Sequence, residues 1–183
     1  MHVPEVGFGE SSPDTWPSQA ASEQWHAILT RSRHERKVFD QLAGKGIDAF
    51  LPTTFKWSHY KGRRKRIEWP LFPGYCFVHC SADMPLPVLT CTGVCQIVGF
   101  AGRPAPIPDY EIEAIQRLVT TTLPFDPWPF VPEGAAVRVV RGPLAGTRGR
   151  LIKKGDDFRL LLSIELLGRV LSVHVDAGDV ERA

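Results

Sequence analysis

The fold is decided by two separated stretches, Leu71-Phe72-Pro73-Gly74-Tyr75-Cys76-Phe77-Val78 and Arg141-Gly142-Pro143-Leu144-Ala145-Gly146-Thr147-Arg148-Gly149. The first predicts a strand that opens at a Pro-Gly turn. Because side chains alternate along a strand, Tyr75 and Phe77 should share one face. The second predicts the first hairpin of a small all-β domain, in which glycines mark the turns. The chain therefore joins a sheet that carries aromatic residues to a separate β-domain.

The residues around the first stretch predict strands that alternate with helices. The helices are indicated by apolar positions that recur every 3 or 4 residues, and the strands by short apolar runs that end at glycine or proline. The expected elements are strands at 25–30, 47–51, 71–80 and 93–100, a hairpin over 55–69, and helices over 33–43, 84–91 and from 108.

Proline and glycine content divides the chain into four parts. Residues 1–22 are expected to be a disordered tail, and residues 120–130 a semi-stiff, proline-rich linker. Residues 23–119 predict an α+β domain, a mixed β-sheet flanked by helices. Residues 131–183 predict a small five-stranded SH3-like β-barrel, because short strands there alternate with glycine turns.

Charge and hydropathy narrow the functional classes. The formal net charge is +2, and residues 23–119 hold most of the excess of Lys and Arg over Asp and Glu. Such a clustered positive charge permits nucleic-acid contact. No apolar run reaches the length of about 20 residues that spans a membrane, and no signal peptide is evident. We therefore expect a cytoplasmic protein that does not bind membranes.

Cysteine spacing argues against a metal centre. Cys76, Cys80, Cys91 and Cys95 lack the paired C-x2-C spacing of most structural zinc sites. Cys76 and Cys80 would also lie about 13 Å apart on one strand, at 3.3 Å per residue. We expect buried free thiols and no cofactor. Neither a nucleophile with a nearby base nor a phosphate-binding glycine loop is recognisable, so we do not expect an enzyme.

Four segments, in this order, resemble the NusG family of transcription elongation factors. The resemblance implies that residues 23–119 form the NusG N-terminal domain and residues 131–183 the KOW domain. It further implies a monomeric elongation or antitermination factor that modulates pausing and termination. Residues 164–169 are similar to a specialised branch, the antiterminator paralogues of long polysaccharide operons. The four segments are Leu71-Phe72-Pro73-Gly74-Tyr75, Val98-Gly99-Phe100, Arg103-Pro104-Ala105-Pro106-Ile107 and 141–150.

The resemblance assigns a role to the aromatic strand face. In the family this face forms a hydrophobic concavity that binds the clamp helices of the largest subunit of RNA polymerase. The alternative is that the face is core, since a sheet can be covered on both sides. The matching residues here are Leu29, Phe72, Pro73, Tyr75 and Phe77.

Two groups of cations are candidates for nucleic-acid contact. The first, at the start of the predicted helix, matches the region that contacts non-template DNA in specialised relatives: Arg31, Arg33, Arg36 and Lys37. The second, at the tip of the hairpin, would contact nucleic-acid backbone: Lys61, Arg63, Arg64, Lys65 and Arg66. Either group could instead be solvated surface. Trp57, Tyr60 and Trp69 flank the tip, and we expect the two tryptophans to pack across the strands rather than stack on bases.

The barrel carries a third candidate site. Leu166 and Leu167 precede Gly168 at a predicted turn and are either core or an exposed contact. In the family this region binds a small-subunit ribosomal protein or the termination factor Rho. The housekeeping form carries an aromatic residue where Leu167 stands. Three alternatives stay open: a housekeeping factor that couples polymerase to Rho or the ribosome, an RNA-binding KOW protein of the translation machinery, and a zinc or thiol enzyme.

Overall fold

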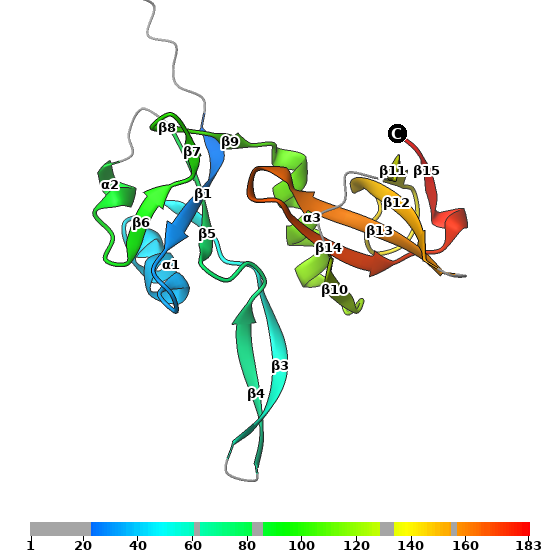
Figure 1. Cartoon of the computed structure of the whole chain (residues 1–183), viewed down its shortest axis with the longest axis horizontal. Helices are drawn as coiled ribbons and strands as arrows, with labels where there is room; N and C mark the ends of the chain where they lie inside the picture. The colour runs from blue at the N-terminus through cyan, green and yellow to red at the C-terminus, as the bar shows by residue number, and fades with distance from the viewer. Residues whose placement is uncertain (1–22, 61–62, 82–85, 129–133, 155–156) are drawn as a thin grey trace, which may run out of the picture.

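The computed structural model describes residues 23–60, 63–81, 86–128, 134–154 and 157–183. Two β-sheet bodies flank the long helix α3 (Asp109–Thr120), and a two-stranded ribbon projects from the N-terminal body (Figure 1). The expected tail at 1–22 and the tip residue Lys61 lie outside the described residues.

The N-terminal body is built on one sheet with the strand order β2-β5-β1-β6, and β9 also pairs with β1. This confirms the expected sheet with helices. Every strand pair in it is antiparallel, however, where we expected a mixed sheet. Its strands are β1 (Gln24–Thr30), β2 (Asp48–Phe50), β5 (Tyr75–Cys80), β6 (Val94–Ile97) and β9 (Pro106–Ile107).

The Pro73-Gly74 turn sets the start of β5, which begins at Tyr75 rather than at residue 71. Gly74 has φ +87°, a conformation that glycine adopts without strain. Its N–H donates to the carboxylate of Glu35 at 2.8 Å, and its carbonyl accepts from the N–H of Thr30 at 2.8 Å. The turn thus connects β5 to both β1 and α1.

The two faces of the sheet belong to different apolar clusters. On one face Ile28, Cys76 and Val78 pack with Val38 and Leu42 of α1 (Glu35–Gly44), and all five are fully buried. The other face belongs to a larger cluster that runs through α3 into the C-terminal body. Both faces of the sheet are therefore covered.

The C-terminal body is a strand-rich, KOW-like domain, as expected, and residues 131–183 contribute five strands to it. A sixth strand, β10 (Phe125–Trp128), pairs with β14, so part of the expected linker is sheet. The order is β10-β14-β13-β12-β11-β15. The five are β11 (Ala135–Val139), β12 (Arg148–Lys154), β13 (Asp157–Ile164), β14 (Arg169–His174) and β15 (Val180–Arg182).

No described helix is both long and apolar enough to cross a membrane.

The remaining elements are short or project from the sheets. The ribbon pairs β3 with β4, as expected for a hairpin, and a smaller hairpin pairs β7 with β8. The bounds are β3 (Thr53–Tyr60), β4 (Arg63–Pro70), α2 (Leu86–Leu89), β7 (Gly99–Phe100), β8 (Arg103–Pro104), and the 3-10 turns η1 (Glu165–Leu167) and η2 (Ala177–Asp179).

Candidate functional site

The sheet brings the predicted apolar residues together. Leu29 on β1 lies directly opposite Tyr75 on β5, and Ala27 lies opposite Phe77. Directly opposed residues share a face, so Leu29, Tyr75 and Phe77 are on the same side of the sheet. Phe72 packs edge-on against Phe77, with ring centroids 5.7 Å apart. We call this surface, with Pro73 at its edge, the aromatic face.

The aromatic face is more buried than an open concavity would be. Phe77 is 0% exposed and Phe72 is 2% exposed, both within the large apolar cluster. Leu29 and Tyr75 are half-buried, and Pro73 is exposed. The expectation that the whole face is left outside is therefore wrong for the two phenylalanines, which form its floor. Its accessible part is the rim formed by Leu29, Pro73 and Tyr75.

Two aromatic residues that we did not predict as site residues, Trp25 and Phe50, extend this face. Phe50 on β2 lies opposite Phe77, and their ring centroids are 6.2 Å apart. Trp25 on β1 packs edge-on against Phe50 at 6.4 Å. Phe50 falls in a strand that we did predict. Its alternation with Ala49 could have placed it beside Phe77 once the strand order was known.

The ribbon formed by β3 and β4 carries exposed aromatic residues stacked with arginines. Phe55 and Trp57 are 55% and 62% exposed. The Arg66 guanidinium lies 3.8 Å from the centroid of the Phe55 ring, and that of Arg64 lies 5.2 Å from the Trp57 ring. Trp57 thus contacts a side chain of the neighbouring strand, in agreement with the expected packing across the strands, although Trp57 and Trp69 remain 62% and 48% exposed.

A polar cluster at the base of the ribbon attaches it to α1. The guanidinium of Arg36 forms an ion pair with the Glu68 carboxylate at 2.5 Å, and the Thr53 hydroxyl donates to Glu68 at 2.7 Å. The hydrogen bond from Thr53, followed by that from Arg36, lowers the pKa of Glu68. Arg36, which we proposed for DNA contact, is thus already paired within the protein.

The other predicted cations whose side chains the structure describes are exposed. α1 begins at Glu35, so Arg33 precedes the helix instead of lying on its face, and it adopts φ 61°. Arg31, Arg33 and Lys37 are exposed. At the ribbon tip, the side chains of Arg64, Lys65 and Arg66 are exposed. Nothing is described of the side chain of Arg63.

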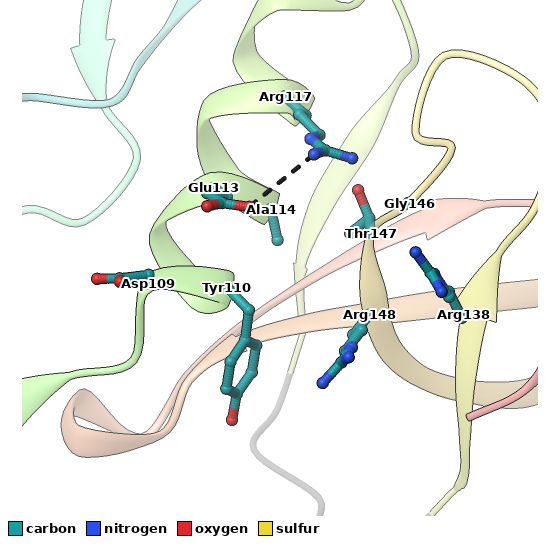
Figure 2. Close-up of a pocket in the computed structure, with 9 residues that line it drawn as sticks. All are labelled: Asp109, Tyr110, Glu113, Ala114, Arg117, Arg138, Gly146, Thr147 and Arg148. Atoms are coloured by element: carbon teal, nitrogen blue, oxygen red, sulfur yellow. Dashed lines mark ion pairs between the residues drawn. The ribbon is translucent and has the colours of Figure 1, made fainter.

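Helix α3 joins the two bodies. The Glu165 N–H at the start of η1 donates to the Glu111 carboxylate at 3.1 Å. Near the other end of α3, the guanidinium of Arg117 donates to the carbonyl of Ala145 at 2.5 Å. Figure 2 shows Arg117 reaching from α3 toward the loop at Gly146. A Cβ at Gly146 would lie 2.6 Å from that guanidinium, so a glycine permits the approach.

Burial between α3 and the C-terminal body shifts the pKa of Glu111. Glu111 is 4% exposed, and desolvation raises the pKa of its carboxyl to about 7. The hydrogen bond from the Glu165 N–H opposes that rise, and the negative charge of Glu165 adds to it. Sequence patterning gave no signal for this contact, because it depends on which face of α3 meets the barrel.

The predicted partner site on the barrel is partly covered. Leu166 and Leu167 lie in η1, are half-buried, and pack against the large apolar cluster. Gly168 follows them with φ 58°. The two leucines are therefore neither fully core nor fully exposed.

The cysteines differ in exposure. Cys76 and Cys91 are buried, Cys80 is intermediate and Cys95 is exposed, so the expectation of four buried thiols is wrong for Cys95. Burial raises the pKa of Cys76 to about 12. Within the described residues, no group of three or more His, Cys, Asp or Glu side chains is placed to hold a metal ion.

Comparisons with known proteins agree with this architecture. The transcription termination/antitermination proteins NusG of Vibrio vulnificus (strain CMCP6) and Escherichia coli (strain K12) are each 29% identical to the chain, over 180 and 185 residues. These alignments cover 90% and 91% of the chain, and 98% and 99% of the relatives.

A solved structure and a family model point the same way. The structure titled "Domain interaction in Thermotoga maritima NusG" superposes with a TM-score of 0.51 at 23% identity, covering 89% of this chain and 98% of that chain. This likeness shows the fold. The family model described as "Transcription termination factor nusG" matches residues 23–116, which is about half of the chain. The chain therefore belongs to the NusG family of transcription termination factors.

Proposed function

We propose that this NusG-family protein is an elongation factor that binds RNA polymerase through the aromatic face. The observation that carries the proposal is the apolar rim of Leu29, Pro73 and Tyr75, in which Leu29 and Tyr75 share a sheet face with the buried Phe77 and Pro73 follows the buried Phe72. Because the residues next to this rim are tightly packed, an apolar partner helix can dock on the rim without rearranging it. Anchors seated on well-packed surroundings contribute most of the energy of protein interfaces. The expected partner is the pair of clamp helices of the largest polymerase subunit.

Bound there, the factor would favour the closed, elongating clamp over the opened, paused one, provided that it binds the closed state more tightly. The KOW domain would recruit a second partner, a small-subunit ribosomal protein or Rho. Leu167, where the housekeeping form has an aromatic residue, supports the operon-specific antiterminator over the housekeeping factor. Assays on several templates separate the two, because an operon-specific factor acts only where its DNA element is present.

Tyr75→Ala is expected to abolish the effect of the protein on pause lifetime in a purified bacterial elongation complex. Losing one such anchor costs about 2 kcal/mol or more, which is roughly a thirtyfold loss of affinity. Phe100→Ala is the matched control, because Phe100 is 73% exposed and is not part of the apolar cluster that contains Phe72 and Phe77. Wild-type activity in the Tyr75 variant, or no binding of wild type to polymerase, would contradict the proposal.

We further propose that the ribbon contacts nucleic acid near the polymerase. Its support is the stack of Arg64 on Trp57 and of Arg66 on Phe55. Guanidinium groups held in this way can bind phosphate while the rings offer faces for unpaired bases. The ion pair between Arg36 and Glu68 holds the ribbon base against α1 and so limits its direction.

Replacing Arg64, Lys65 and Arg66 together with alanine is expected to weaken binding of single-stranded oligonucleotide and to flatten its salt dependence. Each phosphate contact contributes about 0.7 to the slope of log affinity against log salt, so the slope should fall by about 2. The control is Phe55→Ala with Trp57→Ala, which removes stacking and should leave the slope unchanged. An unchanged slope in the triple variant would rule out phosphate contact by the ribbon.

A further inference from the structure

A cavity between α3 and the β11–β12 hairpin has no part in polymerase binding as proposed. Its volume of about 540 Å³ lies within the range of roughly 300–1,000 Å³ that is common for small-molecule sites. Three arginines line it, Arg117 from α3 and Arg138 and Arg148 from the barrel (Figure 2). A cavity with three guanidinium groups is suited to an anion.

Two of these arginines, Arg138 and Arg148, repel each other. Arg138 and Arg148 lie directly opposite each other on β11 and β12, so their side chains share one face. Like charges in directly opposed positions destabilise a strand pair. Neither forms an ion pair with any residue that the structure describes. Glu181 on β15 lies directly opposite Arg138 on its other side and offsets part of this repulsion. An anion bound between Arg138 and Arg148 would offset more of it.

The third arginine is already positioned. Arg117 donates to the carbonyl of Ala145 at 2.5 Å and lies 3.9 Å from the Glu113 carboxylate. Thr147, which also lines the cavity, is 4% exposed, and its hydroxyl oxygen is buried without a hydrogen-bond partner. A buried hydroxyl without a partner costs stability.

The carboxylates on the α3 side of the cavity favour a compact anion over a nucleic-acid strand. Asp109 and Glu113 lie on the α3 side, away from Arg138 and Arg148 (Figure 2). A nucleic-acid strand passing through the cavity would bring its next phosphates against these carboxylates, which would repel it. A compact ligand with a phosphate at one end and hydrogen-bond donors at the other meets complementary charge at both walls.

An aromatic side chain lies at the cavity mouth. Tyr110, in the first turn of α3, is 47% exposed and lies beside Arg148 (Figure 2). Burial raises the pKa of the Tyr110 hydroxyl, so it remains a neutral donor at physiological pH. Its ring offers a face on which a planar base can stack.

We propose that this cavity binds a small phosphorylated ligand of the mononucleotide class. The phosphate lies between Arg138 and Arg148, the base lies against Tyr110, and hydroxyl or amino groups of the ligand face Asp109 and Glu113. Because the cavity has one wall on α3 and the other on the barrel, the bound ligand also stabilises the contact between the two bodies. This inference does not depend on polymerase binding.

The test is isothermal titration calorimetry of the full chain with AMP, GMP, adenosine, inorganic phosphate and a single-stranded oligonucleotide. A mononucleotide should bind, and adenosine should not. Arg138→Ala with Arg148→Ala should weaken mononucleotide binding about tenfold or more, since two charge-assisted hydrogen bonds are lost. Arg169→Ala removes an exposed arginine of the same sheet outside the cavity and should leave the affinity unchanged.

Four outcomes would overturn the proposal. They are no binding of either mononucleotide, an unchanged affinity in the double variant, binding of the oligonucleotide alone, and inorganic phosphate binding as tightly as the nucleotides. If the double variant fails to fold, the single variant Arg148→Gln takes its place in the same titration. It keeps a polar side chain at this position while removing the positive charge.

Discussion

Phe77→Ala is expected to lower the free energy of unfolding by about 3–5 kcal/mol, the usual cost of deleting a buried phenylalanine ring. Phe77 is 0% exposed and packs against the rings of Phe72 and Phe50. The cluster around it continues through α3 into the barrel, so the resulting cavity weakens both bodies. Urea denaturation followed by circular dichroism measures this change.

The matched control makes the same chemical change at the surface. Phe100→Ala, at a side chain that is 73% exposed, should alter the free energy of unfolding by less than about 0.5 kcal/mol. Equal stability of the Phe77 variant and wild type would show that the floor of the aromatic face is not packed as described.

Glu111→Gln is expected to make the protein more stable than wild type at pH 8, by up to about 3 kcal/mol. The pKa of Glu111 is raised from 4.5 to about 7 in the folded protein, so folding favours its protonated form. Wild type therefore gains stability as the pH falls through 7 toward 4.5 and loses it again as the pH rises. Glutamine is neutral at every pH and can still accept the hydrogen bond from the Glu165 N–H.

The measurement is thermal unfolding of both proteins between pH 5 and 8, and the difference between them should vanish toward the acid end. The charged side chains that line the same cavity of about 270 Å³ as Glu111 are those of Glu165, Arg148 and Arg150. Glu113→Gln is the control, because the Glu113 side chain is 59% exposed and should show no such pH-dependent gain. A constant difference at all pH values would contradict the raised pKa.

The local elements could be predicted because their signals lie within the sequence itself. The hairpin around residues 61–62 and the helix after Pro108 formed as expected, since turn residues and apolar periodicity define them. The start of α1 was missed by two residues, because the turn at Arg33 depends on a positive φ that the sequence does not indicate.

The burial of the candidate site could not be predicted in the same way. Alternation placed Tyr75 and Phe77 on one face, but whether that face is open depends on α3, about thirty residues later. The two bodies also meet through Glu111 and Arg117, which looked like ordinary charged positions on a helix. The apolar periodicity of one segment does not show which distant segment it packs against.

Strand β10 sets the length of free chain between α3 and the KOW domain. With β10 paired to β14, only residues 121–124 connect α3 to the barrel, and this segment spans at most about 14 Å when fully extended. If β10 separates from β14, the connection becomes residues 121–134 and spans at most about 50 Å. β10 is an edge strand and Pro127 has no N–H to donate, so few bonds hold it. A partner that captures β10 would thereby lower the effective concentration of one body near the other.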